Sequence, residues 1–312
     1  MKDYAPCLIS VYNRPLHFRR CIESLAKCYG ASSTPLFVAI DAPYREADKA
    51  ANMATIRFAH EINGFKSIDL IIRERNVGAH NNIAMARNEI FRRYDRIVFS
   101  EDDNVFAPHF LEFVNQGLSL YENDPTIFSI CGYSYPLDFS RCVSGDAFAM
   151  RAFSSWGVGY WKEKFLKLDY QSKDFLGNYL SLLKVRKLNK SVGSNIFPSL
   201  VASRMKNEIY GDTAITYHLY KNDMLCIFPK TSLVRNLGND GSGLHSGKCK
   251  VYEEQEIDMR RTASPRLDIV RENQCARRLV NDYFRINPTT ALYYYLTYCL
   301  LSVRARILKK KE

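Results

Sequence analysis

The sequence lacks the features that would assign a chain to a membrane-spanning, zinc-binding or repeat class. Its apolar tail, Ala291 to Val303, has 13 residues, whereas a bilayer span needs about 20. Its nine cysteines are scattered, odd in number and without a CxxC pair. We therefore expect buried reduced thiols in a cytosolic protein, and no zinc site. The N-terminal residues have the pattern of neither a signal peptide nor an anchor, and no internal repeat or low-complexity run is present.

The chain has the composition of an ordinary globular protein with excess positive charge. The apolar fraction is 46% and the charged fraction 25% of 312 residues, which suffices for a large core in one or two domains. The net charge of +11 indicates an anionic partner, such as a nucleotide, a nucleic acid or a membrane surface. No RNA- or DNA-binding motif accompanies this charge, so we expect no nucleic-acid partner.

The first 125 residues alternate between short apolar runs and amphipathic segments. The apolar runs predict strands at 6–12, 36–40, 68–72 and 96–100. The other segments predict helices at 15–28, 45–61, 83–91 and 108–121. This alternation is typical of an α/β fold, a mostly parallel sheet with covering helices. Beyond residue 125 the alternation stops, and strands are expected at 126–135, 146–153, 225–228 and 232–235.

The fourth predicted strand leads directly into three consecutive carboxylates, Glu101, Asp102 and Asp103. Adjacent like charges repel one another, so the triplet favours a partner such as Mg²⁺ or Mn²⁺ holding a phosphate. Alternatively, the acids cap the next helix, which Pro108 opens. Ligands of parallel sheets bind at the carboxyl ends of the strands. Other polar residues at such ends are Asn13, Arg14, Asp41, Arg75 and Asn76, and together they predict a nucleotide site.

Three later stretches carry candidate functional residues. Both tryptophans lie in 154–161, where Trp156 and Gly157 predict a sugar-stacking platform; a turn in the core is the alternative. Asp212 lies at the start of a predicted helix, where an N-cap is the ordinary role and where the helix amides would keep its carboxylate ionised. The glycine-rich segment 236–247 predicts a mobile loop or a ligand lid.

The apolar and tyrosine-rich tail is followed by five basic residues: Arg304, Arg306, Lys309, Lys310 and Lys311. This pattern predicts an interfacial helix with a basic end that contacts a membrane surface peripherally. A last helix packed on the domain is the alternative.

In this order of motifs the chain resembles glycosyltransferases of the GT-A (Rossmann-like) fold. It is most similar to bacterial sugar transferases related to family 2 and to the N-acetylglucosaminyltransferase I group. The resemblance rests on 10–15, 75–80, 99–103, Trp156-Gly157 with Gly211-Asp212, and 241–245, and it covers about residues 6 to 247. It implies a GT-A domain at 1–250, with a nucleotide-binding half (1–125) and an acceptor half (126–250). A C-terminal helical extension with a basic tail would follow at 251–312.

The resemblance also implies roles for individual residues. Asp103 would bind the metal, Mn²⁺ or Mg²⁺, with His245 reaching the metal or the diphosphate, and Asp212 would be the catalytic base. Trp156 and Gly157 would contact the sugar or acceptor. The nucleotide-sugar contacts would be Tyr12, Asn13, Arg14, Asp41, Arg75, Asn76, His80, Glu101 and Asp102. Two features depart from the eukaryotic group: that group has an anchor and stem, and tryptophans where Tyr210 and Thr213 flank Asp212 here.

The sequence therefore predicts a metal-dependent, inverting glycosyltransferase of polysaccharide biosynthesis. We expect it to move a sugar from a nucleotide-sugar, a UDP-sugar, to a glycan or lipid-linked glycan acceptor. The expected location is the bacterial cytoplasm, with peripheral contact to the inner membrane face. One alternative is a nucleotidyltransferase of related fold, which would have a glycine-rich loop after the first strand; 13–17 has no glycine. The other is a non-enzymatic, basic nucleic-acid-binding protein, which only the net charge favours.

Overall fold

The computed structural model describes residues 4–170, 172, 174–177, 181–241, 249–260 and 262–309. Eight strands form one mixed sheet in the order β3-β2-β1-β4-β8-β6-β9-β7. The first four are β1 (Cys7–Val11), β2 (Pro35–Ile40), β3 (Ser67–Ile72) and β4 (Arg96–Glu101), and they pair in parallel. All six residues of β2 are buried, as expected for a parallel strand covered on both faces.

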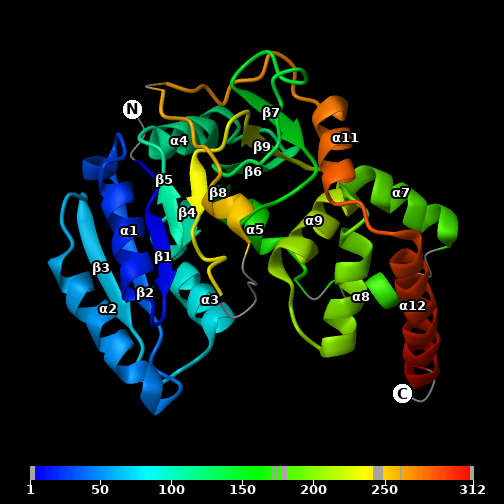
Figure 1. Ribbon diagram of the computed structural model, residues 1–312, viewed down its shortest axis with the longest axis horizontal. Helices are drawn as coiled ribbons and strands as arrows, with labels where there is room; N and C mark the ends of the chain where they lie inside the picture. The colour runs from blue at the N-terminus through cyan, green and yellow to red at the C-terminus, as the bar shows by residue number, and fades with distance from the viewer. Residues whose placement is uncertain are drawn as a thin grey trace.

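The helices of this first region are α1 (Pro15–Ala26), α2 (Lys49–Glu61), α3 (Ala79–Ile90) and α4 (Phe110–Leu120), with short 3₁₀ turns η1 (Ala31–Ser33) and η2 (Glu46–Asp48). Figure 1 shows α1 and α2 together on one side of the sheet. Helix α1 begins with Pro15, a residue suited to the first helical position, and buries Phe18, Cys21, Ile22 and Leu25. This three-to-four-residue spacing gives the helix one apolar face against the sheet.

The second region completes the sheet with β6 (Ile127–Cys131), β7 (Ala147–Met150), β8 (Val158–Trp161) and β9 (Leu225–Pro229). Strand β8 is antiparallel to both β4 and β6, and β9 lies between β6 and β7. A separate antiparallel pair joins β5 (Asn104–Phe106) to β10 (Val234–Asn236). This pair brings the segment after residue 233 to the acidic triplet.

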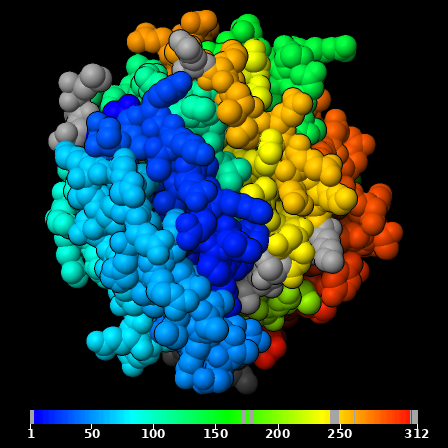
Figure 2. Space-filling model, turned by 60° about the vertical axis from the view of Figure 1, so that its left-hand side comes forward, coloured from blue at the N-terminus to red at the C-terminus, as the bar shows by residue number. Residues whose placement is uncertain are grey.

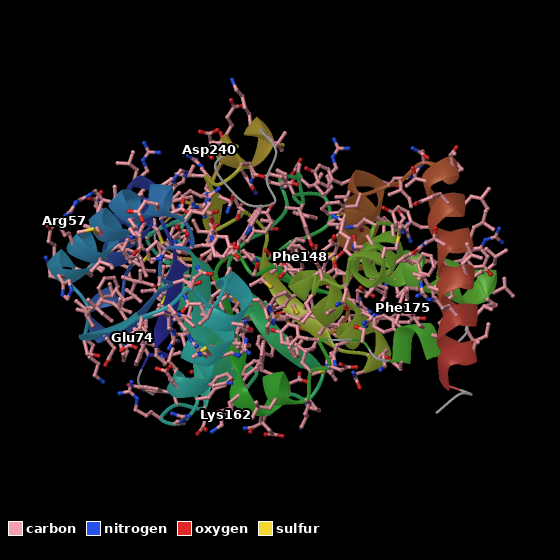
Figure 3. All side chains as sticks on the ribbon, turned by 90° about the horizontal axis from the view of Figure 1, so that it is seen from below. Arg57, Glu74, Phe148, Lys162, Phe175 and Asp240 are labelled. Atoms are coloured by element: carbon pink, nitrogen blue, oxygen red, sulfur yellow. A yellow bond between two sulfur atoms is a disulfide. The ribbon has the colours of Figure 1, made fainter. Side chains whose placement is uncertain are left out.

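A helical part adjoins the second region. It contains α6 (Asp174–Gly177), α7 (Leu182–Val192), α8 (Ile196–Lys206), α9 (Gly211–Lys221), α11 (Gln274–Tyr283) and α12 (Pro288–Lys309). Two short helices lie elsewhere: α5 (Lys162–Leu166) contacts β8, and α10 (Lys250–Glu253) contacts β10. The helical part has its own apolar cluster, which includes Phe175, Phe197 and Tyr298. Figure 3 shows Phe175 beside α12, at the opposite end of the molecule from Arg57 and Glu74. None of the described helices combines the length and apolar composition that a membrane crossing requires.

The predicted α/β fold with a mostly parallel sheet and a helical C-terminal region is confirmed. The expectation that all cysteines are reduced is wrong for two of them, because Cys142 and Cys275 form a disulfide. These residues are 133 positions apart and become neighbours only when α11 packs against the loop after β6, which the spacing does not reveal. Seven cysteines are free, and five of them are buried.

Candidate active site

The carboxyl ends of β1, β2 and β4 place the candidate residues at one edge of the sheet. Strand β1 pairs with both neighbours, so that Ser10 lies beside Glu101 and Val11 beside Ile40. The chain then continues from each strand into polar residues: Asn13 and Arg14 after β1, Asp41 after β2, and Asp102 and Asp103 after β4. The predicted convergence of these segments is therefore present in the structure.

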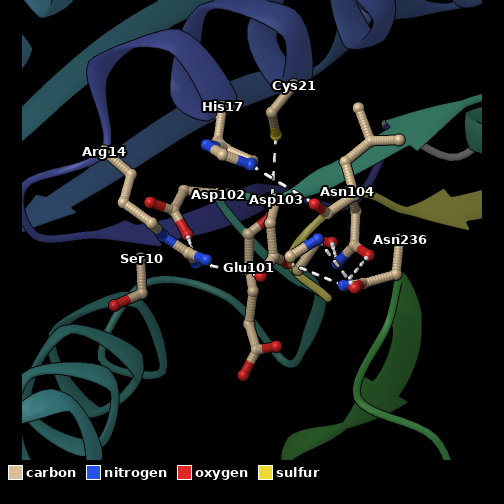
Figure 4. A network of polar contacts seen from close by, with 12 residues as sticks. Ser10, Arg14, His17, Cys21, Glu101, Asp102, Asp103, Asn104 and Asn236 are labelled. Carbon is tan, nitrogen blue, oxygen red and sulfur yellow. Dashed lines mark hydrogen bonds and ion pairs between the residues drawn. The ribbon is translucent and has the colours of Figure 1, made fainter. Parts of the chain in front are cut away.

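Arg14 bridges two of the three acids in the triplet. Its Nη2 donates to Asp102 Oδ1 at 2.5 Å and to Asp103 Oδ2 at 2.9 Å, as Figure 4 shows. Glu101 points away from this network in the same view. The triplet is thus divided: two carboxylates share one guanidinium, and the third is directed elsewhere.

The segment after β10 holds Asp103 from its other side. Asn236 Nδ2 donates to Asp103 Oδ1 at 2.8 Å, and the Leu237 amide donates to the Asp103 carbonyl at 2.8 Å. A Cβ added to Gly238 would lie 2.0 Å from Asp103 Oδ2, so this position accepts no larger residue without moving the carboxylate. His17 on α1 joins the same segment through Leu237 O at 3.3 Å. Figure 2 shows the N-terminal residues in blue meeting this later, yellow-coloured part of the chain on one face.

Asp102 and Asp103 are buried and Glu101 is partly buried, in an environment with more negative than positive charge. Burial, followed by the charges of Asp103, Asp212 and Asp102, raises the pKa of Glu101 to about 8. Burial also raises the pKa of Asp102 to about 7, although Arg14 opposes the shift. The influence of Asp212 on Glu101 means that the triplet and the start of α9 are electrostatic neighbours.

The donor atoms at the triplet suit a hard divalent cation. Carboxylate oxygens are the ligands that Mg²⁺ and Mn²⁺ prefer, and buried carboxylates in excess of cations are stabilised by added positive charge. Among the described residues, no group of three Asp, Glu, His or Cys side chains could by itself hold an ion. Sites that use one or two carboxylates and complete the coordination with substrate phosphates do not need such a group. The residues therefore fit a cation that binds together with a diphosphate.

Asp41 organises the loop that opens α3. It is 3% exposed; its Oδ1 accepts from the Val77 amide at 3.0 Å and its Oδ2 from the Gly78 amide at 2.9 Å. Asn76 donates to Asp41 Oδ2 at 3.2 Å and to the Ala42 carbonyl at 2.7 Å. Both oxygens of Asp41 are thus occupied by loop groups, and its position in this structure is that of a loop clamp beside the predicted nucleotide site.

The remaining predicted nucleotide contacts lie around this clamp. Tyr12 and Asn13 both donate to Asp48 at 2.9 Å, so they attach β1 to the start of α2. Arg75 is exposed on the loop after β3. His80 lies in the first turn of α3, with its ring edge-on to Tyr170 at 5.7 Å between centroids. The structure therefore does not bring Arg75 or His80 into the Arg14–Asp103 network.

Asp212 lies in the first turn of α9 and its carboxylate is directed to another element. The N-cap of α9 is Tyr210, without a side-chain cap, so the interpretation of Asp212 as an N-cap is wrong. Its Oδ2 accepts from the Ser155 amide at 3.2 Å and from the Ser155 hydroxyl at 3.4 Å. Burial raises the pKa of Asp212 to about 6, and the Ser155 bonds oppose this shift. The expectation that helix amides hold it ionised does not account for this pKa, because burial is the larger effect.

Asp212 lines a cavity of about 230 Å³ whose wall includes six aromatic side chains, and we call it the aromatic cavity. Trp156 lies in the wall, with its ring edge-on to Tyr133 at 4.8 Å and to Tyr252 at 5.3 Å. Gly157 has a φ of +69°, and a Cβ there would meet Val234 at 2.8 Å. The lack of a side chain at Gly157 thus allows close packing in the core. Gly157 is not among the residues that line the cavity. Trp161, the other tryptophan, is buried and donates to the Leu118 carbonyl at 3.2 Å.

One predicted site residue lies outside the described part of the chain, and four residues of the site were not predicted from the sequence. His245 falls in 242–248, outside the described residues. Asn236 and Gly238, which position Asp103, gave only the signal of a glycine-rich segment. Ser155 and Arg277, beside Asp212 and in the cavity wall, gave no recognisable signal, because they come from segments more than 55 residues distant from Asp212.

Comparison with known proteins gives a family match for the first part of the chain. Residues 1–135, less than half of the chain, match the model of the GNT-I family. No curated protein sequence matches the chain. Solved structures that it resembles include TarS of S. aureus, at 10% identity and a TM-score of 0.39, covering 76% of this chain and 37% of that chain. A shorter form, TarS 1–349, aligns at 11% identity and a TM-score of 0.42, covering 76% of this chain and 61% of that chain.

The bifunctional glycosyltransferase WbbM aligns at 11% identity and a TM-score of 0.33, covering 54% of this chain and 33% of that chain. This chain thus spans less than two thirds of the length of each of these structures. Such weak likenesses carry no argument, so the class rests on the family match together with the sheet and the acidic triplet. These findings support the predicted class, a GT-A-like glycosyltransferase. The match ends at residue 135, so it includes Tyr133 and Tyr135 of the cavity wall but none of the other residues that line the cavity.

Proposed function

We propose that this glycosyltransferase takes a sugar from a UDP-sugar and transfers it, with inversion, to a glycan or lipid-linked glycan acceptor, with Mn²⁺ or Mg²⁺ as cofactor. The observation that carries the proposal is the placement of Asp212. Its partly buried carboxylate lines the cavity, and it is close enough to the acidic triplet to raise the pKa of Glu101. A donor diphosphate at the triplet and an acceptor in the cavity would therefore be neighbours.

In this proposal each residue has a definite task. Asp103, positioned by Arg14 and Asn236, would hold the cation, which when bound neutralises charge on the leaving diphosphate. Asp212 would accept the proton of the acceptor hydroxyl, a task that needs an ionised carboxylate. With a pKa of about 6, Asp212 is mostly ionised at neutral pH and remains basic enough to take a proton.

The aromatic walls of the cavity suit a sugar ring. Trp156 presents a large ring whose two neighbours, Tyr133 and Tyr252, hold it edge-on. Aromatic faces bind apolar sugar surfaces without needing charge, and their rigid side chains lose little conformational freedom. This placement supports an acceptor site in the cavity and a donor site at the acidic triplet.

The test separates metal binding from base catalysis in two variants. Asp103→Asn should weaken Mn²⁺-dependent UDP binding, because an amide is a poorer ligand for a hard cation than a carboxylate. Asp212→Asn should leave UDP binding unchanged and lower transfer by about two to four orders of magnitude, the usual contribution of a general base. UDP affinity is measured by calorimetry and transfer by product formation. Near-normal transfer by Asp212→Asn would remove Asp212 from the reaction.

A peripheral membrane contact is proposed for α12, since one face of this helix is exposed and apolar. Tyr298, on its inner face, is fully buried and donates to the Phe175 carbonyl at 3.1 Å. The outward apolar side chains are Leu292, Leu296, Leu300, Val303 and Ile307. Arg304 follows in the same helix, and basic residues beside an apolar stripe favour an anionic lipid surface. Both interpretations of the tail are thus compatible on different faces of one helix.

This contact can be tested without removing the buried face of α12. Leu296→Glu combined with Leu300→Glu should lower binding to vesicles containing phosphatidylglycerol, as measured by co-sedimentation. The matched control is Leu182→Glu with Leu183→Glu, two exposed leucines of another helix, and it should bind normally. Equal binding by both pairs would contradict the membrane contact.

The cytoplasmic location stays a prediction, and the disulfide opposes it because disulfides persist mainly in oxidising compartments.

A further inference from the structure

The aromatic cavity contains one cation whose presence the proposed sugar stacking does not explain. Arg277 of α11 lines the cavity and is only 3% exposed. Its guanidinium makes one described hydrogen bond, from Nη1 to the Arg151 carbonyl at 3.1 Å, and its Nε is buried without a partner. An arginine remains charged in proteins, so this is a buried charge with incomplete hydrogen bonding.

No carboxylate among the described residues lies within ion-pair distance of Arg277. The nearest acid by its electrostatic effect is Glu272, and both of its oxygens are engaged by Arg151: Oε1 accepts from the Arg151 amide at 3.0 Å and Oε2 from its Nη1 at 3.2 Å. Glu272 is thus paired with Arg151, which also pairs with Asp223, and neither acid forms a described ion pair with Arg277. Burying a charge without a counter-ion destabilises the folded state, so Arg277 at the cavity wall is expected to lower the stability of the ligand-free protein.

Asp212, Arg277 and Tyr135 all line the cavity. Burial raises the pKa of Tyr135; the charge of Arg277 opposes this shift and the charge of Asp212 adds to it. Among the described residues, no hydrogen bond or ion pair joins Asp212 to Arg277. A second unpartnered polar atom, the Tyr133 hydroxyl, lies in the same wall.

We infer that the acceptor unit carries an oxyanion, a carboxylate or a phosphate, and that Arg277 binds this group while a hydroxyl of the same unit faces Asp212. This inference rests on the proposed function, in which the cavity holds the acceptor. The guanidinium supplies parallel donors that match either oxyanion. The cavity, at about 230 Å³, is below the usual 300–1,000 Å³ of ligand pockets, so one sugar-sized unit enters it.

The test measures binding to the cavity directly, without donor or transfer. Trp156 is one of only two tryptophans and lines the cavity, so its fluorescence reports occupancy; the signal should vanish in Trp156→Phe. Three methyl glucosides that differ only at carbon 6 are titrated: the neutral sugar, the uronate and the 6-phosphate. We expect one charged glycoside to bind at least about tenfold more tightly than the neutral one, and which of them does so identifies the oxyanion.

Arg277→Met should reduce this preference to within about twofold, and Arg277→Lys should retain part of it. The control Arg73→Met, which removes an arginine bonded to Asn82 and Glu89, should keep the preference. Without ligand, Arg277→Met should unfold at the same or a higher temperature, since it removes a buried unpaired charge. Equal binding of all three glycosides by the normal chain, an unchanged preference in Arg277→Met, or failure of that variant to fold would each overturn the inference.

Failure of this inference and failure of the proposed function give different results. If the charged glycoside is preferred but Asp212→Asn transfers sugar normally, only the assignment of the base is wrong. If Asp212→Asn is inactive but all three glycosides bind equally, only the inference that the acceptor carries an oxyanion is wrong.

Discussion

The two halves of the sheet present their functional residues in different ways. In residues 1–125, the proposed nucleotide half, parallel strands end at one edge, and residues that follow them, Arg14 and Asp103, contact one another. The cavity, in contrast, is assembled from loops, from helices α7 to α11 and from residues more than 100 positions apart, such as Trp156 and Arg277. The first arrangement follows from strand order; the second requires the whole chain to be packed.

The disulfide distinguishes the halves most strongly. It ties α11 to the loop before β7, and the nucleotide half contains only free cysteines. Replacing Cys142 and Cys275 by serine should lower the free energy of unfolding by about 3 kcal/mol, because a long loop is no longer closed in the unfolded chain. Mn²⁺-dependent UDP affinity should not change. Denaturant unfolding and calorimetry measure the two effects.

The control for this prediction is Cys249→Ser, a free and partly exposed cysteine, which should change stability by less than about 0.5 kcal/mol. If loss of the disulfide weakened UDP binding as much as it lowered stability, the two halves would not be separable in this way.

A single methyl group should disable the nucleotide half. Gly238→Ala places a Cβ within 2.0 Å of Asp103 Oδ2, so the carboxylate must leave its position. We expect Mn²⁺-dependent UDP affinity to fall about a hundredfold, equivalent to about 2.7 kcal/mol. In Gly145→Ala the new Cβ meets nothing within 4 Å, and affinity should be normal. Normal affinity in Gly238→Ala as well would mean that Asp103 does not contribute to the donor site.

In the acceptor half, removing the charge of Asp212 should stabilise the protein. Its pKa in the folded state, about 6, lies above the ordinary value of 3.8, so the folded state binds the proton more tightly than the unfolded state. The cost of ionising Asp212 is absent below pH 4, grows as the pH rises, and is complete above pH 6. Asp212→Asn should therefore be more stable than the normal chain at pH 7, by about 2 kcal/mol.

The stability difference between Asp212→Asn and the normal chain should shrink between pH 6 and pH 4, as followed by chemical denaturation. Asp268→Asn, at an exposed position, should show no such pH dependence. A destabilised Asp212→Asn at pH 7 would mean that its bonds to Ser155 outweigh burial, and that the carboxylate is structural.

The smallest effect is expected for the aromatic wall. Trp156→Ala should raise the KM for acceptor about tenfold, because the sugar loses one stacking face, and leave UDP affinity unchanged. Trp161→Phe provides the contrast, since Trp161 is buried against α4 and should affect stability alone. A change in UDP affinity in Trp156→Ala would place the ring on the donor side.

The sequence predicts local features well where local physics decides them. The apolar run 36–40 can only be a covered strand, and Pro15 can begin a helix but hardly continue one. The triplet at 101–103 is likewise visible because three adjacent acids have few roles in a folded protein. Asp48, in contrast, receives Tyr12 and Asn13 but looks like any surface acid, and Arg277 looks like any residue of a polar helix. Their roles depend on which distant elements pack around them, and this information is absent from local pattern.

The position of β9 has a consequence for synthesis of the chain. Strand β9 (Leu225–Pro229) separates β6 from β7 in the sheet, although β7 is made about 75 residues earlier. A chain emerging from the ribosome can pair β1 to β4 among themselves early, but β7 has no sheet partner until β9 arrives. Such late, long-range pairing leaves an apolar strand edge exposed during synthesis. A chain that stops before Leu225 should therefore retain a paired N-terminal sheet and aggregate through Ala147–Met150.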